Sequence, residues 1–571
     1  MMYNKFVKIF GAAALAFALV GCTDKVGDNE FNITNNGSNS QEATTIETAV
    51  GLLKGAMPLI HDSREHKYQY QFNLHIDNYA GYLVVANSLQ GRLPRTYSPN
   101  PDFETGPRAN FLWVAQQVVP VMNSAEKLGV PEMGAIAAII YNFAASEYVD
   151  VHGPMPYSDH RVLKSEPPLT YQKVQDIYKL ILEDLDKQQQ ILRGLQTTAE
   201  MQERLNSYDL IAGKRLEGWV KLANSLRMRL AMRMVKAAPE QARQHFEAAF
   251  AAPHLTTSDE DIKFKSENRH PLFVISKDWD DARLNANFLT LLKRLNHPGL
   301  RAWFTAIPNG FKDKNGNISV NAEGVYAGMR AGMQTYPKEQ EIFGKSYKLF
   351  SIVNGEYAEK PIYIFKASEV QFLLAEAALR GWAVGGTAGN YYEMGIAKSF
   401  DSEGLSGLVD YLPQRAADCP PIAYVDYWND QYSVPAEVAC PAPLGVEWDA
   451  SLTQEQQLEM IITQKYIANY PLSLEAWSDH RRTGYPRMMP NVSDDVGDSS
   501  IPPHDWRAPD GKPQPDLFIH RIPFVRSSSV SLDDIRNTAL PALAAEDGSL
   551  FSGKDYQAAH IWWDVVGKGN F

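Results

Sequence analysis

LEGWVKLANSLRMRLAMRM, residues 216 to 234, is the stretch that most clearly indicates the fold. Its apolar side chains recur at intervals of three and four residues, which places them on one face of an α-helix: Trp219, Leu222, Leu226, Leu230 and Met234. Lys221, Arg229 and Arg233 fall off this face. An apolar stripe of this length must pack against neighbouring elements, so the stretch predicts a helix within a mainly helical body.

Seven further stretches carry the same periodicity and extend the prediction along the chain: 46–60, 111–128, 132–148, 171–192, 368–382, 390–400 and 454–470. Short joints between them favour stacked antiparallel hairpins. In one hairpin, small residues within Leu373–Gly381 let a second helix approach, and Gly385-Gly386 breaks the chain before the return helix begins at Tyr391. This hairpin looks like a degenerate tetratricopeptide unit.

Other regions are rich in Gly, Pro, Asn, Tyr and Trp and contain only short strand-like runs. Long loops on a rigid scaffold are where binding surfaces usually lie. Asn315-Gly316 predicts a tight hairpin turn, and the surrounding Asp313–Asn317 resembles a calcium loop without its full ligand spacing. No cofactor is expected, and whether the protein binds a structural calcium ion stays an open question. The body at 46–571 divides into a helical scaffold at about 46–255, 367–404 and 453–488 and a loop-rich ligand lobe at about 256–366 and 405–452.

The amino end predicts export and lipidation. Two lysines precede an apolar run, Ile9–Val20, that is too short to span a bilayer comfortably. Leu19-Val20-Gly21-Cys22 follows the lipobox pattern, in which the Cys22 thiol receives a diacylglycerol and the signal peptide, residues 1–21, is removed. Residues 22–45 are small and polar and cannot bury a core, so we expect a flexible tether.

Composition limits the partners. The net charge of −12 and the lack of basic runs argue against nucleic acid. Removing 21 of 571 residues leaves 550, which is ample for a large core. No segment after the signal is long and apolar enough to cross a membrane, so acyl chains are the expected membrane attachment.

Besides Cys22 the chain has two cysteines, Cys419 and Cys440, in a Pro-rich stretch. In an oxidising compartment a disulfide between them would close a loop of about 20 residues and stabilise the fold by about 3 kcal/mol. Two free thiols are the alternative. No further Cys or close His pair completes a ligand set, so no metal site is expected.

The search for catalytic signatures finds no Gly-x-Ser-x-Gly elbow, His-Glu-x-x-His pair, Walker loop or Gly-x-Gly-x-x-Gly. The best acid–base pair is Glu475 and Asp479, one helical turn apart beside two arginines, and this pattern favours salt-bridged structure over a glycosidase pair. Asp150–Tyr157 contains Asp and His, but Gly153 before a proline predicts a left-handed cap that ends a helix. We therefore expect that the protein is not an enzyme.

Several of these features together resemble the SusD/RagB family of outer-membrane lipoproteins. Each is modest alone, and their order over nearly the whole mature chain carries the resemblance. Gly153-Pro154 departs from the Gly-Asp of many members, which leaves the subfamily and its substrate open. The features are the lipobox ending at Cys22, Asp150–Ser158 (DVHGPMPYS), Trp219–Ala231 (WVKLANSLRMRLA), Ala367–Ala377 (ASEVQFLLAEA), Glu475–Pro486 (EAWSDHRRTGYP) and Trp562–Asp564 (WWD).

The resemblance implies about four tetratricopeptide-like helix pairs that support an irregular ligand lobe. It also implies a lipid-anchored, surface-exposed protein of the outer membrane, which binds oligosaccharides without catalysis and passes them to a SusC-like TonB-dependent barrel. Peptide capture of the RagB type is the nearest alternative. A surface glycoside hydrolase and a purely structural envelope protein are the other hypotheses.

Sugars bind to flat aromatic faces, while Asn, Asp and Arg hydrogen-bond their hydroxyls. For any single aromatic, burial in the core is the competing explanation, so the prediction concerns groups rather than individual residues. Two groups offer the required mixture: Asp77, Asn78, Tyr79, Tyr82, Asn87, Arg92 and Tyr97 in the first, and Asp278, Trp279, Trp303, Tyr326, Tyr336 and Tyr347 in the second.

Overall fold

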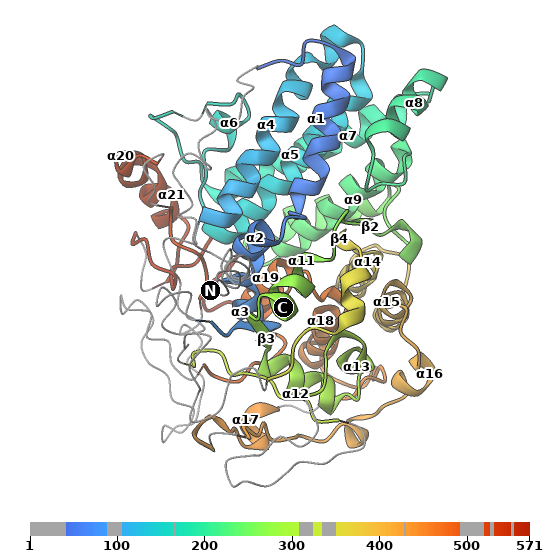
Figure 1. Cartoon of the computed structure of the whole chain (residues 1–571), viewed down its shortest axis with the longest axis vertical. Coiled ribbons are helices and arrows are strands. Elements are labelled where there is room, and N and C mark those ends of the chain that lie inside the picture. Colours follow the sequence, from blue (N-terminus) through green and yellow to red (C-terminus); the bar gives the residue numbers. More distant parts are fainter. Residues whose placement is uncertain are drawn as a thin grey trace, which may run out of the picture.

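The computed structural model shows a mainly helical fold with few short strands, as the sequence predicts (Figure 1). Cys22, the signal peptide and most of the tether lie outside the described part. No helix within that part is long and apolar enough to cross a membrane. The structure describes residues 41–87, 105–164, 166–307, 324–333, 350–427, 430–441, 444–491, 519–525, 530–549 and 553–571.

Long helices from the first half of the chain form one end of the molecule (Figure 1). α4 packs along α5 and α9 along α10, so these neighbours in sequence are neighbours in space, and α7 packs along α9 across the shorter α8. The joint between α4 and α5 is only two residues long, which forces a hairpin. These helices are α1 (Ile46–Ile60), α4 (Thr105–Leu128), α5 (Pro131–His152), α7 (Val174–Gly194), α8 (Ala199–Tyr208), α9 (Leu216–Arg233) and α10 (Pro239–Phe250).

A second helical set comes from the later part of the chain: α14 (Ala367–Leu379), α15 (Ala388–Glu403), α18 (Gln454–Asn469) and α19 (Ser473–Thr483). α14 and α15 form the predicted hairpin. A Cβ added at Gly395 of α15 would lie 2.8 Å from the Phe372 ring of α14, so only glycine permits this close crossing. The predicted helices agree with the structure to within a few residues, except that α4 begins six residues earlier, whereas α8 and α10 were not predicted.

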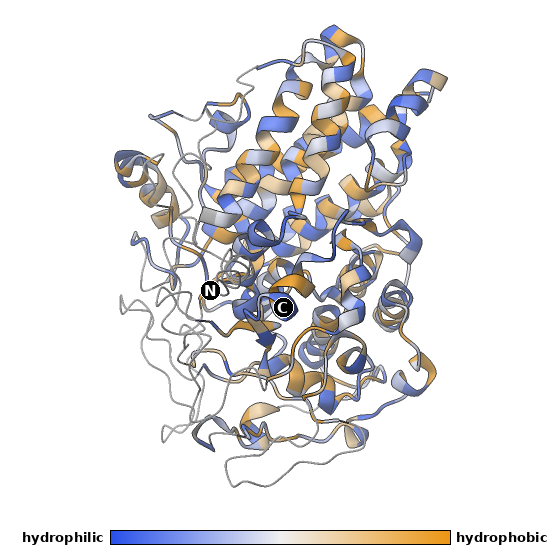
Figure 2. Cartoon of the chain, in the orientation of Figure 1, coloured by the Kyte–Doolittle hydropathy of each residue, from blue (hydrophilic) through white to orange (hydrophobic). Residues whose placement is uncertain are grey.

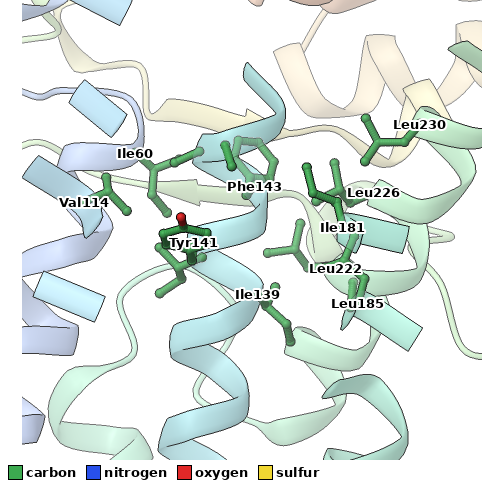
Figure 3. Close-up of a cluster of buried hydrophobic side chains, with 14 of the residues drawn as sticks. Ile60, Val114, Ile139, Tyr141, Phe143, Ile181, Leu185, Leu222, Leu226 and Leu230 are labelled. Carbon is green, nitrogen blue, oxygen red and sulfur yellow. The ribbon is translucent and has the colours of Figure 1, made fainter. Parts of the chain in front are cut away.

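Apolar residues of α1, α4, α5, α7 and α9 interdigitate in one core, which includes the predicted stripe of α9 (Figure 3). Figure 2 shows the corresponding alternation of hydrophobic and hydrophilic residues along these helices. Leu222, Leu226 and Leu230 are almost completely buried. Burying each such side chain contributes about 1.5–3 kcal/mol, so this stripe fixes α9 against its neighbours.

Arg229 and Arg233 of α9 are buried beside this apolar stripe, where they meet carboxylates from three other helices. Arg229 donates two hydrogen bonds to Glu369 of α14, at 2.8 and 2.7 Å. Arg233 pairs with Asp150 of α5 and with Glu475 of α19. The same network continues through Lys465–Asp479 at 2.7 Å and Arg482–Glu376 at 2.6 and 2.8 Å.

This buried ion-pair network consists of Asp150, Arg229, Arg233, Glu369, Glu376, Lys465, Glu475, Asp479 and Arg482. Its members lie on α5, α9, α14, α18 and α19, and each is at most 6% exposed. The structural interpretation of Glu475 and Asp479 is therefore confirmed. The network also explains the charged residues of four separate sequence motifs. Asp150, Arg229, Glu369 and Glu475 each come from a different motif and meet in this network.

Removing one partner of a buried ion pair leaves the other charge without compensation, which costs about 3–5 kcal/mol. We predict that Arg482→Met lowers the free energy of unfolding by this amount in urea denaturation. The double variant Arg482→Met/Glu376→Leu should recover part of the loss, because it removes both charges. Lys127→Met is the matched control, since its pair with Glu42 is exposed and should contribute little. Equal effects of Arg482→Met and Lys127→Met would contradict the stated role of the network.

Two two-stranded antiparallel sheets connect the helical sets to the loop-rich region. β1 (Leu83–Val85) pairs with β3 (Ala282–Leu284), with Val84 opposite Arg283. β2 (Ile262–Phe264) pairs with β4 (Ile362–Phe365), which leads directly into α14. Each sheet joins segments that are far apart in sequence, so the pairing fixes the loop-rich region onto the scaffold.

The remaining elements are short. Those before the second helical set are α2 (Glu65–Tyr68), η3 (Gln69–Asn73), α3 (Ile76–Ala80), α6 (Tyr157–His160), η4 (Ser258–Glu260), α11 (Pro271–Phe273), η5 (Val274–Asp278), α12 (Ala286–Arg294), α13 (Gly299–Trp303) and η7 (Gly355–Glu359). The later ones are α16 (Leu408–Tyr411), η8 (Ala416–Asp418), η9 (Asp430–Tyr432), α17 (Ala436–Ala439), α20 (Leu532–Asp534), η11 (Ile535–Ala539) and α21 (Leu540–Ala544).

The predicted helix stop after α5 is confirmed, although the backbone differs from a left-handed cap. α5 ends at His152, and Gly153 has φ 86° and ψ −137°. A Cβ on Gly153 would lie 3.0 Å from Ile561, so the glycine also permits the C-terminal segment to pack closely. Both constraints favour glycine at this position.

Cys419 and Cys440 are free thiols in the structure, which is the second of the two possibilities that the sequence leaves open. Cys419 donates to Gln414 Oε1 and Cys440 to the Ile422 carbonyl, both at 3.6 Å. The two side chains belong to different apolar clusters, and burial raises the pKa of Cys419. A raised pKa keeps this thiol protonated and slows its oxidation.

We therefore predict that alkylation of the denatured, unreduced protein labels both Cys419 and Cys440. Peptide mass spectrometry with and without prior reduction makes the comparison. Labelling that appears only after reduction would show that a disulfide joins them.

Candidate ligand-binding face

A small polar cluster forms where β1 and β3 meet two short π-helical turns. Asp281, at the start of β3, accepts hydrogen bonds from Gln69 Nε2 at 3.0 Å and from Asn87 Nδ2 at 2.9 Å. Gln69 opens the π-turn η3, and Asn87 follows β1. All three side chains are more than 90% buried, so the carboxylate fixes the relative positions of both strands and of η3.

The second π-turn, η5, ends at Asp278 and presents Trp279. Trp279 is half-buried, because part of the indole packs on the apolar core while the rest stays accessible. Asp280, next in sequence, has φ 63°, and its carboxylate pairs with the buried Arg283 of β3. Single π-turns and left-handed non-glycine residues are costly and occur frequently at functional sites. The segment at Trp279 is thus held in a defined conformation.

A polar surface cavity of about 550 Å³ lies beside this segment. Arg269 lines it and pairs with Asp278 at 2.5 Å, which links the cavity to the residue before Trp279. Lys265 pairs with Glu359 across another part of the lining, at 3.0 Å. The residues that line the cavity are Glu65, Lys265, Ser266, Glu267, Asn268, Arg269 and Glu359. Ligand cavities commonly have volumes of about 300–1,000 Å³, so this one is large enough for a small oligomer.

We use "ligand-binding face" for Trp279, Asp278, Arg269 and this cavity; the buried Asp281 cluster supports the face from beneath. The face combines one accessible aromatic side chain with charged and amide groups, which is the mixture that polyhydroxylated ligands require. Trp279 and Asp278 were among the sequence candidates, and a third candidate, Asn87, lies in the buried cluster beneath the face. Tyr326 is also half-buried at the edge of the same apolar core.

Five other candidates are core residues, and the structure corrects their proposed role. Tyr82 is 1% exposed and its hydroxyl donates to the Tyr466 carbonyl. Trp303 is fully buried, and its indole N–H donates to Glu403 at 3.3 Å. Asp77, Asn78 and Tyr79 are at most 3% exposed. None of the five presents a surface to a ligand, because their rings and amides pack inside.

These aromatics instead build a second core beneath the face. Tyr82 lies 4.6 Å from Tyr466 and Trp303 lies 5.0 Å from Tyr470, measured between ring centroids. Burial raises the pKa of Asp77 to about 6, although Ser473 and Asn73 oppose the shift. This aromatic core explains the richness in Tyr and Trp from which we predicted ligand binding.

Some candidates lie outside the described residues: Arg92, Tyr97, Tyr336 and Tyr347, together with the Asp313–Asn317 string. Described residues near the ends of these stretches, Ala86, Ile307, Met333 and Phe350, belong to one apolar cluster with Val84 of β1.

Sequence reasoning did not identify Gln69, Asp281 or Arg269. Asp280 and Asp281 directly follow Trp279, and Lys265–Arg269 is a continuous polar run, so both signals were present in the sequence. Their connection was hidden, because Gln69 and Asp281 are more than 200 residues apart.

The chemistry of the Glu475 and Asp479 carboxylates opposes an acid–base role. Burial alone would raise the pKa of Asp479, but Lys465 and Arg482 lower it to about 2. Burial likewise opposes ionisation of Glu475, yet Arg229 and Arg233 hold its pKa below the ordinary value. A glycosidase needs one carboxyl group that stays protonated as the acid. Both of these carboxylates stay ionised and paired.

The architecture is a scaffold of paired helices that carries an irregular region of short strands, turns and aromatic side chains. The profile of one family, described as SusD and RagB outer membrane lipoproteins, matches residues 26–564. The chain therefore belongs to the SusD-like family. No curated protein matches the sequence closely enough to count as a relative.

Solved structures agree with this assignment. A chitin-binding SusD homologue from Flavobacterium johnsoniae is 28% identical with a TM-score of 0.75, covering 92% of this chain and 100% of that chain. A SusD homologue from Bacteroides ovatus is 27% identical with a TM-score of 0.74, covering 91% and 99%. One from Bacteroides thetaiotaomicron is 26% identical with a TM-score of 0.74, covering 90% and 98%.

Proposed function

We propose that the protein captures glycan oligomers at the ligand-binding face and delivers them to a SusC-like TonB-dependent barrel. In this proposal the acylated Cys22 anchors it on the outer face of the outer membrane. The observation that carries the proposal is membership of the SusD-like family together with a 28% identical, chitin-binding homologue that aligns over nearly the full length of both chains.

The face supplies suitable chemistry for this ligand class. The accessible part of Trp279 can stack against the C–H face of a sugar ring. Asp278 and Arg269 stand beside it as an ion pair whose acceptor and donor groups can also reach hydroxyls. The cavity beyond Arg269 gives room for further sugar units. A chitin-type oligomer, with its amide groups, is the first ligand to test.

Peptide capture of the RagB type remains the alternative function, because the family includes both kinds of lipoprotein by its description. The cavity lining has three carboxylates and two basic residues, so a basic peptide is the cargo that its charge would favour.

We predict that chito-oligosaccharides bind in isothermal titration calorimetry and that Trp279→Ala weakens binding about tenfold. Loss of one stacked aromatic contact costs about 0.5–1.5 kcal/mol, and 1.4 kcal/mol corresponds to a factor of ten. Trp448→Ala is the matched control, because Trp448 is also half-buried but packs on Tyr392 of α15. Silence across a glycan panel, with binding of basic peptides, would establish the alternative function. Equal weakening of binding by both variants would show that Trp279 does not contact the ligand.

A second prediction separates capture from hydrolysis. Chromatography of the glycan before and after incubation should show no shortening, because the paired carboxylates of α19 cannot supply a protonated acid. Shortening that disappears in Glu475→Gln or Asp479→Asn would overturn the binding-only proposal.

A further inference from the structure

Two buried histidines share one carboxylate oxygen near the carboxyl end of the chain. His520 Nδ1 donates to Asp564 Oδ2 at 2.6 Å, and His560 Nδ1 lies 3.1 Å from the same oxygen. The imidazole rings are stacked, with centroids 3.7 Å apart and planes inclined by 25°. His520 comes from the segment 519–525, whereas His560 and Asp564 belong to the C-terminal segment 553–571.

The ligand-type atoms of these residues all lie within 4.8 Å of one another, so a metal site is the first possibility to examine. A zinc ion binds imidazole nitrogen at about 2.0–2.1 Å with near-tetrahedral angles, which would place the two ring centroids roughly 5 Å apart. The observed 3.7 Å stacking is too close for both rings to point at one ion. Protons, not a metal, fit between these nitrogens and the carboxylate.

We infer that His520, Asp564 and His560 form a proton-sharing latch that fastens the C-terminal segment to segment 519–525. While it is ionised, the Asp564 carboxylate accepts hydrogen bonds and donates none. Each Nδ1 that faces it must therefore carry a hydrogen. One stacked imidazole can then be charged against the carboxylate, but a second positive charge 3.7 Å away would be repelled.

The surroundings determine which histidine carries the charge. The Arg481 guanidinium of α19 donates to the His520 carbonyl at 2.7 Å and adds positive charge on that side. Asp547 accepts from the His560 amide at 3.1 Å and adds negative charge on the other side. The charged residue is therefore His560.

Other titratable groups that act on the latch are His480 of α19 and Lys236 beyond α9. Burial lowers the pKa of His480 to about 4, so it stays neutral at physiological pH. Burial also lowers the pKa of Lys236, to about 8. Neither group supplies the negative charge that His560 needs, which leaves Asp564 as its principal partner.

The two histidines consequently respond to pH in opposite ways. Burial opposes the charge on His560, but Asp564 raises its pKa above the ordinary 6.5. Its stabilisation is complete below pH 6.5 and is lost as the pH rises through the raised value. Burial and the neighbouring His560 lower the pKa of His520. The folded state therefore favours neutral His520, so stability is lost as the pH falls below 6.5.

The latch holds segments that converge on the scaffold. Trp563 donates to Asp150 Oδ1 of the buried network at 2.8 Å, and Arg481 stacks over the Trp563 ring at 4.6 Å. Arg521 pairs with Asp555 at 2.8 Å. Raising the pH should therefore loosen the C-terminal segment first and leave the helical scaffold folded.

The test compares the pH dependence of the thermal midpoint for the full-length protein and its glutamine variants. For His560→Gln, the deficit relative to wild type should be several degrees larger at pH 6 than at pH 9. For His520→Gln, the deficit should be larger at pH 7.5 than at pH 5. Trp448→Ala, which removes a side chain without a titratable group, should give a difference that does not vary with pH. Parallel curves for both latch variants would overturn the proposal.

A measurement on wild type keeps the proposal testable if the variants fold poorly. Hydrogen exchange in peptides from 553–571, corrected for the intrinsic rate, should show more frequent opening at pH 8.5 than at pH 6. Equal opening at both values would refute the latch. An equimolar zinc addition should leave the thermal midpoint unchanged. A rise of several degrees that chelation reverses and His520→Gln abolishes would instead establish a metal site.

Discussion

The buried ion-pair network is the constraint on which the rest of the structure depends. Arg229 and Arg233 place two guanidinium groups on the inner side of α9, and charges buried without partners would destabilise the fold by several kcal/mol. Three other helices supply the carboxylates at the correct height: Asp150 from α5, Glu369 from α14 and Glu475 from α19. Such a network fixes helix register more strictly than apolar packing does, because leucines can slide past one another while paired charges cannot.

This rigidity separates the scaffold from the ligand-binding face. The acidic pair of α19 faces inward and takes part in architecture. Arg229 and Arg233 neutralise Glu475, and Lys465 and Arg482 neutralise Asp479. Around Trp279, by contrast, π-turns, short strands and a left-handed residue hold polar groups close to the surface. An aromatic core built on Tyr82 and Trp303 lies between the two regions and supports the face from below. Shape changes on binding are thus expected on the irregular side, where few regular hydrogen bonds oppose them.

Much of the fold could be predicted from the sequence, because helical periodicity depends on local spacing. α1, for example, has the predicted bounds of 46–60. The site was harder, since composition does not distinguish an aromatic that binds sugar from one that packs: Trp279 and Trp303 look alike in sequence, yet only the first is accessible. Pairing between β1 and β3, and the contact of Gln69 with Asp281, depend on tertiary structure alone. The state of the two cysteines could not be decided from the sequence for the same reason, because spacing along the chain gives no information on the two separate clusters that bury Cys419 and Cys440.

The central claim is that a fixed helical scaffold presents a face that holds cargo passively. Hydrogen–deuterium exchange with and without a bound glycan tests it most directly, because the method reports the protection of scaffold and face in one experiment. The account predicts protection in peptides that span 265–287, with no change in α9 or α19. Protection centred on Glu475 and Asp479, with the Trp279 segment unaffected, would contradict it.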